Sequence, residues 1–436
     1  MNNVGSRPIC LILYSLNHFN PEFDVKLSGS SAGRIAKQIY DAALSTGTHD
    51  VVYADAFDST TWPHEQPDVL ITILDNLNLA RRRLRPEKIF GIAVNYHPLD
   101  RVNLVYSAKR EGVHWRNLVP SDGIYQEHSA LKYLDRLLIV GNESTGDSYS
   151  KRLPNKPLKL THYKSSLRHG PLERELLVQP RAINVLFLMS AIGFRKGADL
   201  AFEAATMISD SGNSQINFYF VGAPSNQYWA DELERVANGR PDIFYCGWMD
   251  NKAEDFSTLL SKIDFAVFPA REEGLVGALL EAIDHGIPSL HSQFVGIDSS
   301  DSALTLDELS SKEVREKILG LAELRPEERV LLHKIQLETL NNQFGGQTSI
   351  EEIVNDWLKN LDKNTVNSNL LLHKVQRGIW DLVNFMKLLF CFPRLSLGRI
   401  RLNYLQFVLS NLHESNPHIY RLLRLIYHFL RKFAKS

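Results

Sequence analysis

The chain has 436 residues, which is too long for one compact core and predicts two domains with an appendage. Hydrophobic residues make up 44% and charged residues 23%, as in an ordinary globular enzyme, and a formal net charge of −1 argues against a nucleic-acid binder and an acidic solvating protein. The charge is uneven: residues 365–436 contain eleven Lys or Arg and two acids, a net of +9, so the rest of the chain carries −10.

Cysteine usage and hydropathy bear on the compartment. Cys10, Cys246 and Cys391 are far apart and fit no metal-ligand spacing, and such a sparse, odd set is typical of a reducing compartment. The apolar run 9–14 is too short for a signal peptide, and no stretch reaches the roughly 20 apolar residues of a spanning helix. We therefore expect a cytoplasmic protein.

The first half alternates strand-like and helix-like segments. A Gly/Ser loop at 28–33 leads from the first apolar strand into the helix-like run RIAKQIYDAAL. Short apolar strands separated by helix-length segments predict a parallel sheet covered by helices. The expected strands are 8–14, 68–74, 88–94 and 135–141.

The alternation restarts after a polar, basic stretch at 150–181, where we expect the interdomain linker. The second series predicts strands at 184–190, 216–222, 243–247, 265–269 and 287–290, with helices at 198–208, 228–237, 253–263 and 276–286. The predicted organisation is thus two Rossmann-like halves, at 1–170 and 181–347. Flavoproteins and periplasmic binding proteins share this outline.

The C-terminal part differs in composition. Ser349 and Glu352 form the pattern of a capping box and predict a terminal helix within 348–363. The basic extension 364–436 places Leu and aromatic residues at helical spacing with Arg and Lys between them. Two interpretations stay open: an amphipathic surface on an anionic membrane, which would make the protein peripheral, or packing against the two domains or a partner.

The segment FPAREEGLVGALLEAIDHGIPSL, at 268–290, is the most informative in the chain. It places Glu273 on a loop after a strand and Glu281 eight residues on, in a helix expected to begin near Val276. The exposed amides of Val276, Gly277 and Ala278 would suit a phosphate, and carboxylates suit vicinal hydroxyls. This combination predicts a nucleotide-sugar site; the alternative is a strand–turn–helix with one solvated and one structural acid.

The same segment resembles the E-x7-E signature of retaining GT-B glycosyltransferases, in particular glycosyltransferase family 4 (glycosyltransferases group 1). The resemblance implies a GT-B fold, in which two Rossmann-like parallel-sheet domains face a cleft. It also implies that Glu273 binds the transferred sugar and Glu281 the nucleotide ribose. The likeness is good over 184–297, weak in the first half and absent from the extension.

A second block, FRKGADLAFEAA at 194–205, follows the first strand of the second half. Cations at a helix start oppose the helix dipole unless an anion binds there. We therefore predict that Arg195, Lys196 and Gly197 hold the donor diphosphate; a solvated basic turn is the alternative. The family usually has an arginine where this chain has Ala191, and Arg195 is the substitute that we expect.

Three weaker predictions complete the site. Trp248, in CGWM, resembles the turn that flanks the nucleobase in the family, although core packing would explain it equally well. Gly29 and Ser30, in the Gly/Ser loop, would approach the donor diphosphate or the acceptor, or merely cap a helix. His97, after a strand in AVNYHPLD, is the candidate for the histidine that many family members place under the transferred sugar, with a structural role as the alternative.

By resemblance, the enzyme would be a retaining transferase that uses a nucleotide-diphosphate sugar, most simply a UDP- or GDP-sugar, with no bound metal and no cofactor. The acceptor would be a glycan, which membrane contact would make lipid-linked or part of a cell-surface polysaccharide. Alternatives are a nucleotide-sugar epimerase or phosphorylase and an inactive, glycosyltransferase-like scaffold. A nicotinamide oxidoreductase is disfavoured because no strand is followed by G-x-G-x-x-G.

Overall fold

A computed structural model of the chain describes residues 7–16, 19, 21, 31–74, 76–98, 100, 127–128, 130–153, 156–162, 182–212, 215–251 and 253–361. The predictions made for Gly29 and Ser30, for most of the expected linker and for the basic extension 364–436 therefore lie outside the described residues. No helix within these ranges is long and apolar enough to cross a membrane.

The N-terminal domain contains a six-stranded parallel sheet in the order β2-β1-β3-β4-β5-β6. The strands are β1 Ile9–Tyr14, β2 Asp50–Asp55, β3 Val69–Ile73, β4 Lys88–Ala93, β5 Arg136–Val140 and β6 Leu158–Thr161. The helices described here are α1 Ser31–Ser45, α2 Leu77–Leu84, the 3-10 turn η3 Leu131–Tyr133 and α5 Glu143–Ser150. The four predicted strands are confirmed, because each is an apolar run buried in the sheet.

Two strands of this sheet were not predicted. β2 and β6 lie at its edges, where their side chains are only partly buried and the apolar signal is correspondingly weak. Because β6 pairs with β5, the expectation that the linker begins at residue 150 is wrong: the chain returns to the N-terminal sheet as far as Thr161.

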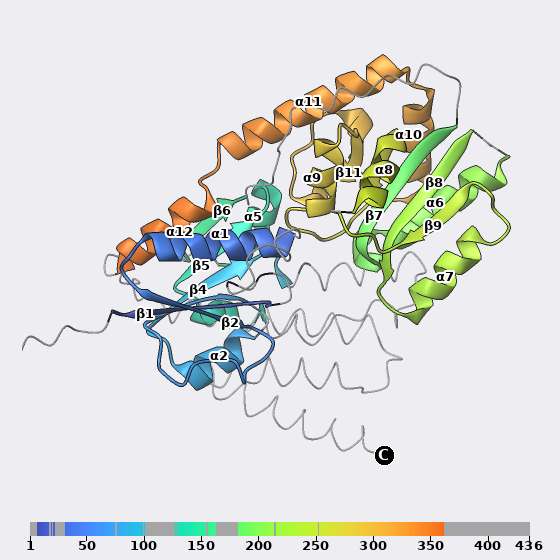
Figure 1. Ribbon diagram of the computed structural model, residues 1–436. Helices are drawn as coiled ribbons and strands as arrows, with labels where there is room; N and C mark the ends of the chain where they lie inside the picture. Colours follow the sequence, from blue (N-terminus) through green and yellow to red (C-terminus); the bar gives the residue numbers. More distant parts are fainter. Residues whose placement is uncertain are drawn as a thin grey trace, which may run out of the picture.

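The C-terminal domain repeats the plan with a second parallel sheet in the order β12-β11-β10-β7-β8-β9 (Figure 1). Its strands are β7 Ile183–Ile192, β8 Ile216–Pro224, β9 Ile243–Gly247, β10 Phe265–Phe268, β11 Ser289–Ser292 and β12 Thr305–Leu306. Its helices are α6 Ala198–Asp210, α7 Gln227–Ala237, α8 Glu254–Lys262, α9 Gly277–Asp284 and α10 Ser311–Glu323, with 3-10 turns η4 Phe194–Lys196, η5 Gln293–Val295 and η6 Ser302–Leu304. Every strand and helix predicted for this half is confirmed.

The last two described helices carry the chain back to the N-terminal domain. α11 (Pro326–Gly345) runs from one domain toward the other, and α12 (Ile350–Lys359) lies beside α1 (Figure 1). The predicted capping box is confirmed, since Ser349 and Glu352 exchange backbone-to-side-chain hydrogen bonds. Trp357 of α12 packs on Phe90 of β4 with ring centroids 4.9 Å apart, which anchors the terminal helix on the first sheet.

Candidate active site

A carboxylate and two cations meet where β7 and β10 end. Glu273 Oε1 lies 3.0 Å from Lys196 Nζ and 3.3 Å from Arg195 Nε. Glu273 is 8% exposed and the Lys196 side chain 12%, whereas the Arg195 side chain is 41% exposed. Two cations share one carboxylate, so this cluster keeps one surplus positive charge that an arriving anion can neutralise.

A close approach of two loops builds this cluster. Gly197 has φ +74°, and a Cβ there would lie 2.0 Å from the carbonyl oxygen of Pro269, so only glycine lets the η4 turn reach the loop after β10. We predicted Gly197 as a donor ligand; its conformation and packing already explain why glycine stands there.

Arg271, which the sequence analysis missed, joins the same two loops. Its guanidinium forms a bidentate ion pair with Asp199, at 2.6 and 2.7 Å, and lies 4.0 Å from the centre of the Phe194 ring. Its backbone amide donates to the carbonyl of Arg195. The only sequence signal was an arginine directly before the two acids, in a loop following a buried strand.

The cluster also meets the N-terminal domain. The Gly274 amide donates to the carbonyl of Val94 at 3.1 Å, and a Cβ on Gly274 would lie 2.2 Å from that oxygen. Asn95, the next residue, accepts a hydrogen bond from Arg195 Nη1 through Oδ1 at 3.4 Å. The hydroxyl of the buried Tyr149 donates a hydrogen bond to the backbone carbonyl of Asn95, which fixes the backbone at this residue. Asn95 is thus the side chain after β4 that faces the cluster.

His97 does not occupy the position that we expected. Its side chain is fully buried, packed against the rings of Tyr149 and His128 with centroids 5.3 and 5.4 Å apart. The backbone amide of His97 donates a hydrogen bond to Ser148 Oγ, so it is not available to a sugar. Because the chain turns after β4, the side chain of Asn95 faces the cluster, whereas the side chain of His97 is buried inside the N-terminal domain.

The start of α9 offers fewer free amides than predicted. Val276 donates to the carbonyl of Val295, and its side chain is buried in the core, so its proposed role as a phosphate ligand is not supported. Gly277 and Ala278 open the helix, and within the described part of the chain no hydrogen bond from their amides is seen. The expected anion site at this helix start therefore reduces to these two amides.

The second acid of the signature lies at the domain boundary. Glu281, on the second turn of α9, is 3.6 Å from Arg34 Nη2 on the first turn of α1. Asp284 is close by: burial, and secondarily the negative charge of Glu281, raise the pKa of Asp284 from 3.8 to about 7, while Arg34 opposes the shift. This second cluster therefore joins Arg34 to two acids across the two domains.

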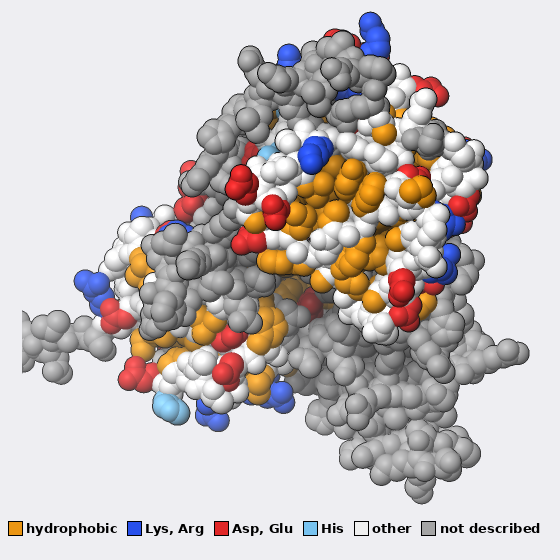
Figure 2. All heavy atoms as spheres, turned by 45° about the vertical axis from the view of Figure 1, so that its right-hand side comes forward, with side chains coloured by type: hydrophobic (Ala, Val, Ile, Leu, Met, Phe, Trp, Pro, Cys, Tyr) orange, Lys and Arg blue, Asp and Glu red, His pale blue; other side chains and the backbone are white. Residues whose placement is uncertain are grey.

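Trp248 lies in the turn after the edge strand β9, where Gly247 adopts φ +73°. The indole is 65% exposed, which excludes the core-packing interpretation. Phe244 and Tyr245 on the same strand are also exposed. Figure 2, which brings the side of the C-terminal domain forward, shows hydrophobic side chains gathered on its surface. A role for Trp248 beside a nucleobase stays a prediction.

Among the described residues, no group of three or more His, Cys, Asp or Glu side chains is arranged to hold a metal ion.

Residues 183–323 match the family model described as "Glycosyl transferases group 1". The matched region contains both acids of the signature, the Arg195–Lys196 pair and the whole second sheet up to α10. No curated protein matches the sequence significantly.

Solved structures resemble the chain in fold at low sequence identity. Sucrose-phosphate synthase from Thermosynechococcus elongatus has a TM-score of 0.56 at 16% identity and covers 81% of this chain and 98% of its own. WaaG, a glycosyltransferase involved in lipopolysaccharide biosynthesis, has a TM-score of 0.51 at 15% identity and covers 81% and 100%. A trehalose-phosphate synthase from Burkholderia xenovorans, solved with glucose-6-phosphate, has a TM-score of 0.51 at 12% identity and covers 82% and 100%.

The chain spans only 55% of the length of a further similar structure, S. aureus TarM, with a TM-score of 0.48.

Two facing Rossmann-like domains with a helix returning to the first define the GT-B fold, which the comparisons with solved structures support. The second domain, over residues 183–323, matches the family model of the group 1 glycosyl transferases.

Proposed function

We propose that the protein is a retaining glycosyltransferase that moves a sugar from a nucleotide-diphosphate sugar to a glycan acceptor without a metal ion. The observation that carries this proposal is the cluster of Glu273, Lys196 and Arg195 at the ends of β7 and β10. It supplies hydroxyl acceptors and phosphate cations within one ion-paired group. UDP- and GDP-sugars are the donors that we expect.

The donor diphosphate would bind to Lys196, Arg195 and the amides of Gly277 and Ala278. Phosphate charge then competes for the two cations, which releases Glu273 to accept hydrogen bonds from the hydroxyls of the transferred sugar. Glu281 would accept from the ribose hydroxyls, with Arg34 reaching the same region from the N-terminal domain. In this arrangement Arg195 takes the place of the arginine that the family has at position 191.

In the reaction, the acceptor hydroxyl oxygen bonds to the anomeric carbon while the bond from that carbon to the diphosphate oxygen breaks. The hydroxyl proton passes to the departing phosphate, and the nucleoside diphosphate leaves. Lys196 and Arg195 stabilise the charge that grows on the leaving oxygen. Attack on the face that the diphosphate leaves retains the anomeric configuration. Glu273 and Asn95 would hold the sugar from opposite domains during this step.

The test is calorimetric titration of the full chain with UDP-, GDP- and ADP-sugars, followed by NMR of the product's anomeric proton. We expect one donor to bind without added divalent cation and in the presence of a chelator, and the product to keep the donor's configuration. An inverted product would contradict the retaining mechanism, and a requirement for divalent cation would contradict metal independence. Failure of every donor to bind would contradict the proposed function and favour a scaffold role.

A further inference from the structure

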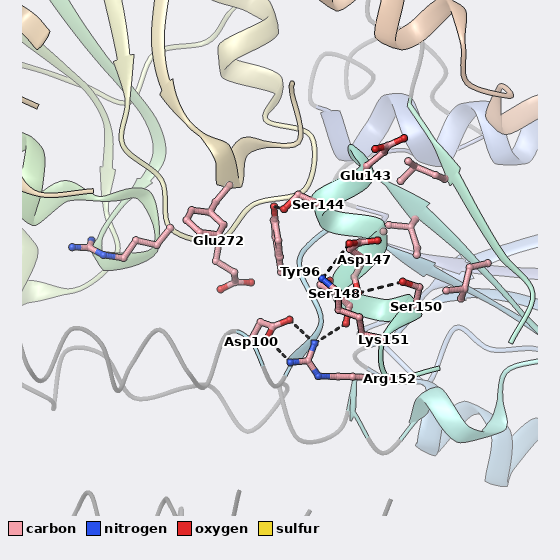
Figure 3. Close-up of a pocket in the computed structure, with 16 residues that line it drawn as sticks. Tyr96, Asp100, Glu143, Ser144, Asp147, Ser148, Ser150, Lys151, Arg152 and Glu272 are labelled. Atoms are coloured by element: carbon pink, nitrogen blue, oxygen red, sulfur yellow. Dashed lines mark hydrogen bonds and ion pairs between the residues drawn. The ribbon is translucent and has the colours of Figure 1, made fainter. Parts of the chain in front are cut away.

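A cavity of about 950 Å³ is lined by residues of both domains (Figure 3). α5 and the residues around Tyr96 and Asp100 form its N-terminal wall. Arg271, Glu272 and Phe294 contribute from the C-terminal domain. The volume falls in the range of about 300–1,000 Å³ that small-ligand sites occupy.

This cavity adjoins the cluster proposed to hold the transferred sugar. Glu272, which lines the cavity, directly precedes Glu273, and the Cα atoms of consecutive residues are only about 3.8 Å apart. The Glu272 side chain is buried, and Figure 3 shows its carboxylate directed toward the cavity on the side of Tyr96 and Asp100. A ligand in the cavity would therefore sit beside the sugar bound at Glu273.

The charges of the lining favour an uncharged ligand. Arg152 forms a bidentate ion pair with Asp100. Lys151 Nζ lies 3.1 Å from a carboxylate oxygen of Asp147. Arg271 forms an ion pair with Asp199, which does not line the cavity. Glu143 and Glu272 bring two further carboxylates. Among the described residues that line this space, counted with Asp199, acids outnumber cations by two, so a phosphate or carboxylate group beside them would meet repulsion.

The remaining lining suits a sugar. Ser144 and Ser150 line the space with hydroxyl groups, and the carboxylates accept hydrogen bonds from vicinal hydroxyls. The ring of Phe294, which packs edge to face on Tyr96 with centroids 5.7 Å apart, offers apolar surface to the C–H face of a pyranose. Tyr96 is fixed in this position by donating to Ser144 Oγ.

We propose that this cavity, between α5 and Glu272, is the acceptor site and that it takes an uncharged, hydroxyl-rich glycan in place of a phosphorylated sugar. The inference rests on the proposed function, because it assigns the acceptor of the same reaction. Glu272 and Asp147 bind the acceptor hydroxyls, and the neighbouring Glu273 loop delivers one of them to the anomeric carbon.

The experiment measures nucleoside diphosphate released from the donor that the wild-type chain binds. The acceptor probes are uncharged methyl glycosides and disaccharides on one side, and glucose 6-phosphate and mannose 6-phosphate on the other. Wild type, Glu272→Gln and Asp147→Asn are compared, with Glu203→Gln on the exposed face of α6 as the matched control. Donor affinity is measured for each protein by calorimetry.

We expect uncharged glycosides to stimulate release and the sugar phosphates to have no effect. Glu272→Gln and Asp147→Asn should each raise the half-saturating glycoside concentration roughly 5- to 20-fold with unchanged donor affinity, and Glu203→Gln should not. Stimulation by a sugar phosphate, no stimulation by any glycoside, or unchanged acceptor dependence in both variants would overturn this inference while leaving donor binding intact. If the wild type binds no donor, the proposed function itself fails.

Discussion

The two acids of the signature lie in contrasting surroundings. Glu273 is buried beside Lys196 and Arg195 of its own domain, in a cluster fixed by Gly197 and by the Arg271–Asp199 pair. Glu281 is partly exposed and its cation, Arg34, comes from the other domain. The first cluster is preformed within one domain, whereas the second exists only where α1 meets α9. Preorganised charge suits the chemical step, and charge shared between domains suits binding coupled to closure.

The largest effect should come from the preformed cluster. Glu273→Gln keeps the shape of the side chain and removes its charge, so we expect kcat to fall roughly 100- to 1,000-fold, because the hydroxyls of the transferred sugar lose their carboxylate in the transition state. Steady-state release of nucleoside diphosphate is the measurement, with thermal unfolding as a check on folding. Glu203→Gln is the control. A variant retaining more than about a third of wild-type kcat would show that Glu273 only balances the two cations.

The geometry that builds this cluster can be tested through stability. Gly197→Ala forces a Cβ against Pro269 and should lower the free energy of unfolding by about 2–4 kcal/mol. Gly239→Ala is a matched control, because Gly239 has the same φ of +74° but no atom within 4 Å of an added Cβ, and it should cost only about 1 kcal/mol. Denaturant unfolding measures both. Equal losses would mean that backbone strain alone explains Gly197.

The interdomain cluster should affect binding more modestly. Arg34→Ala leaves Glu281 and Asp284 without their cation close to the expected donor nucleotide, so we expect roughly 5- to 20-fold weaker binding of the nucleoside diphosphate. Lys37→Ala removes a cation from the same helix, where it pairs with Asp41 on the exposed face. Calorimetry should separate the two variants; if both bind the diphosphate equally well, Arg34 has no part in the donor site.

The smallest effect concerns pH. Because the pKa of Asp284 is raised to about 7, its protonated form stabilises the folded state at low pH, and this contribution is lost as the pH rises through 7. Asp284→Asn resembles the protonated acid. We expect its Tm to exceed that of the wild type at pH 8, and the excess at pH 8 to be larger than the excess at pH 5 by about 1–3 °C. Scanning calorimetry at the two pH values tests this, and a constant difference would contradict the assignment.

The second domain was predictable from the sequence because most of its strands are largely buried and read as apolar runs, and because the residues of its candidate site lie close together in the chain. Glu273 and Glu281 are eight residues apart, and the Arg195–Lys196 pair lies in the turn directly after β7. The capping box of α12 was equally local. Local spacing therefore determined the two-domain α/β organisation and brought together the acids and cations of the candidate donor site.

Only the tertiary structure decided which side chains of the first domain lie beside the acids and cations of the candidate donor site. Whether Asn95 or His97 faces the cleft depends on how the chain turns after β4, and a shift of two residues moves a side chain from the cleft to the core. The pairing of Arg34 with Glu281, the clamp of Arg271 on Asp199 and the cavity beside Glu272 join residues up to 247 positions apart in the chain. Sequence spacing carries no information on such contacts, because they depend on the packing of one domain against the other.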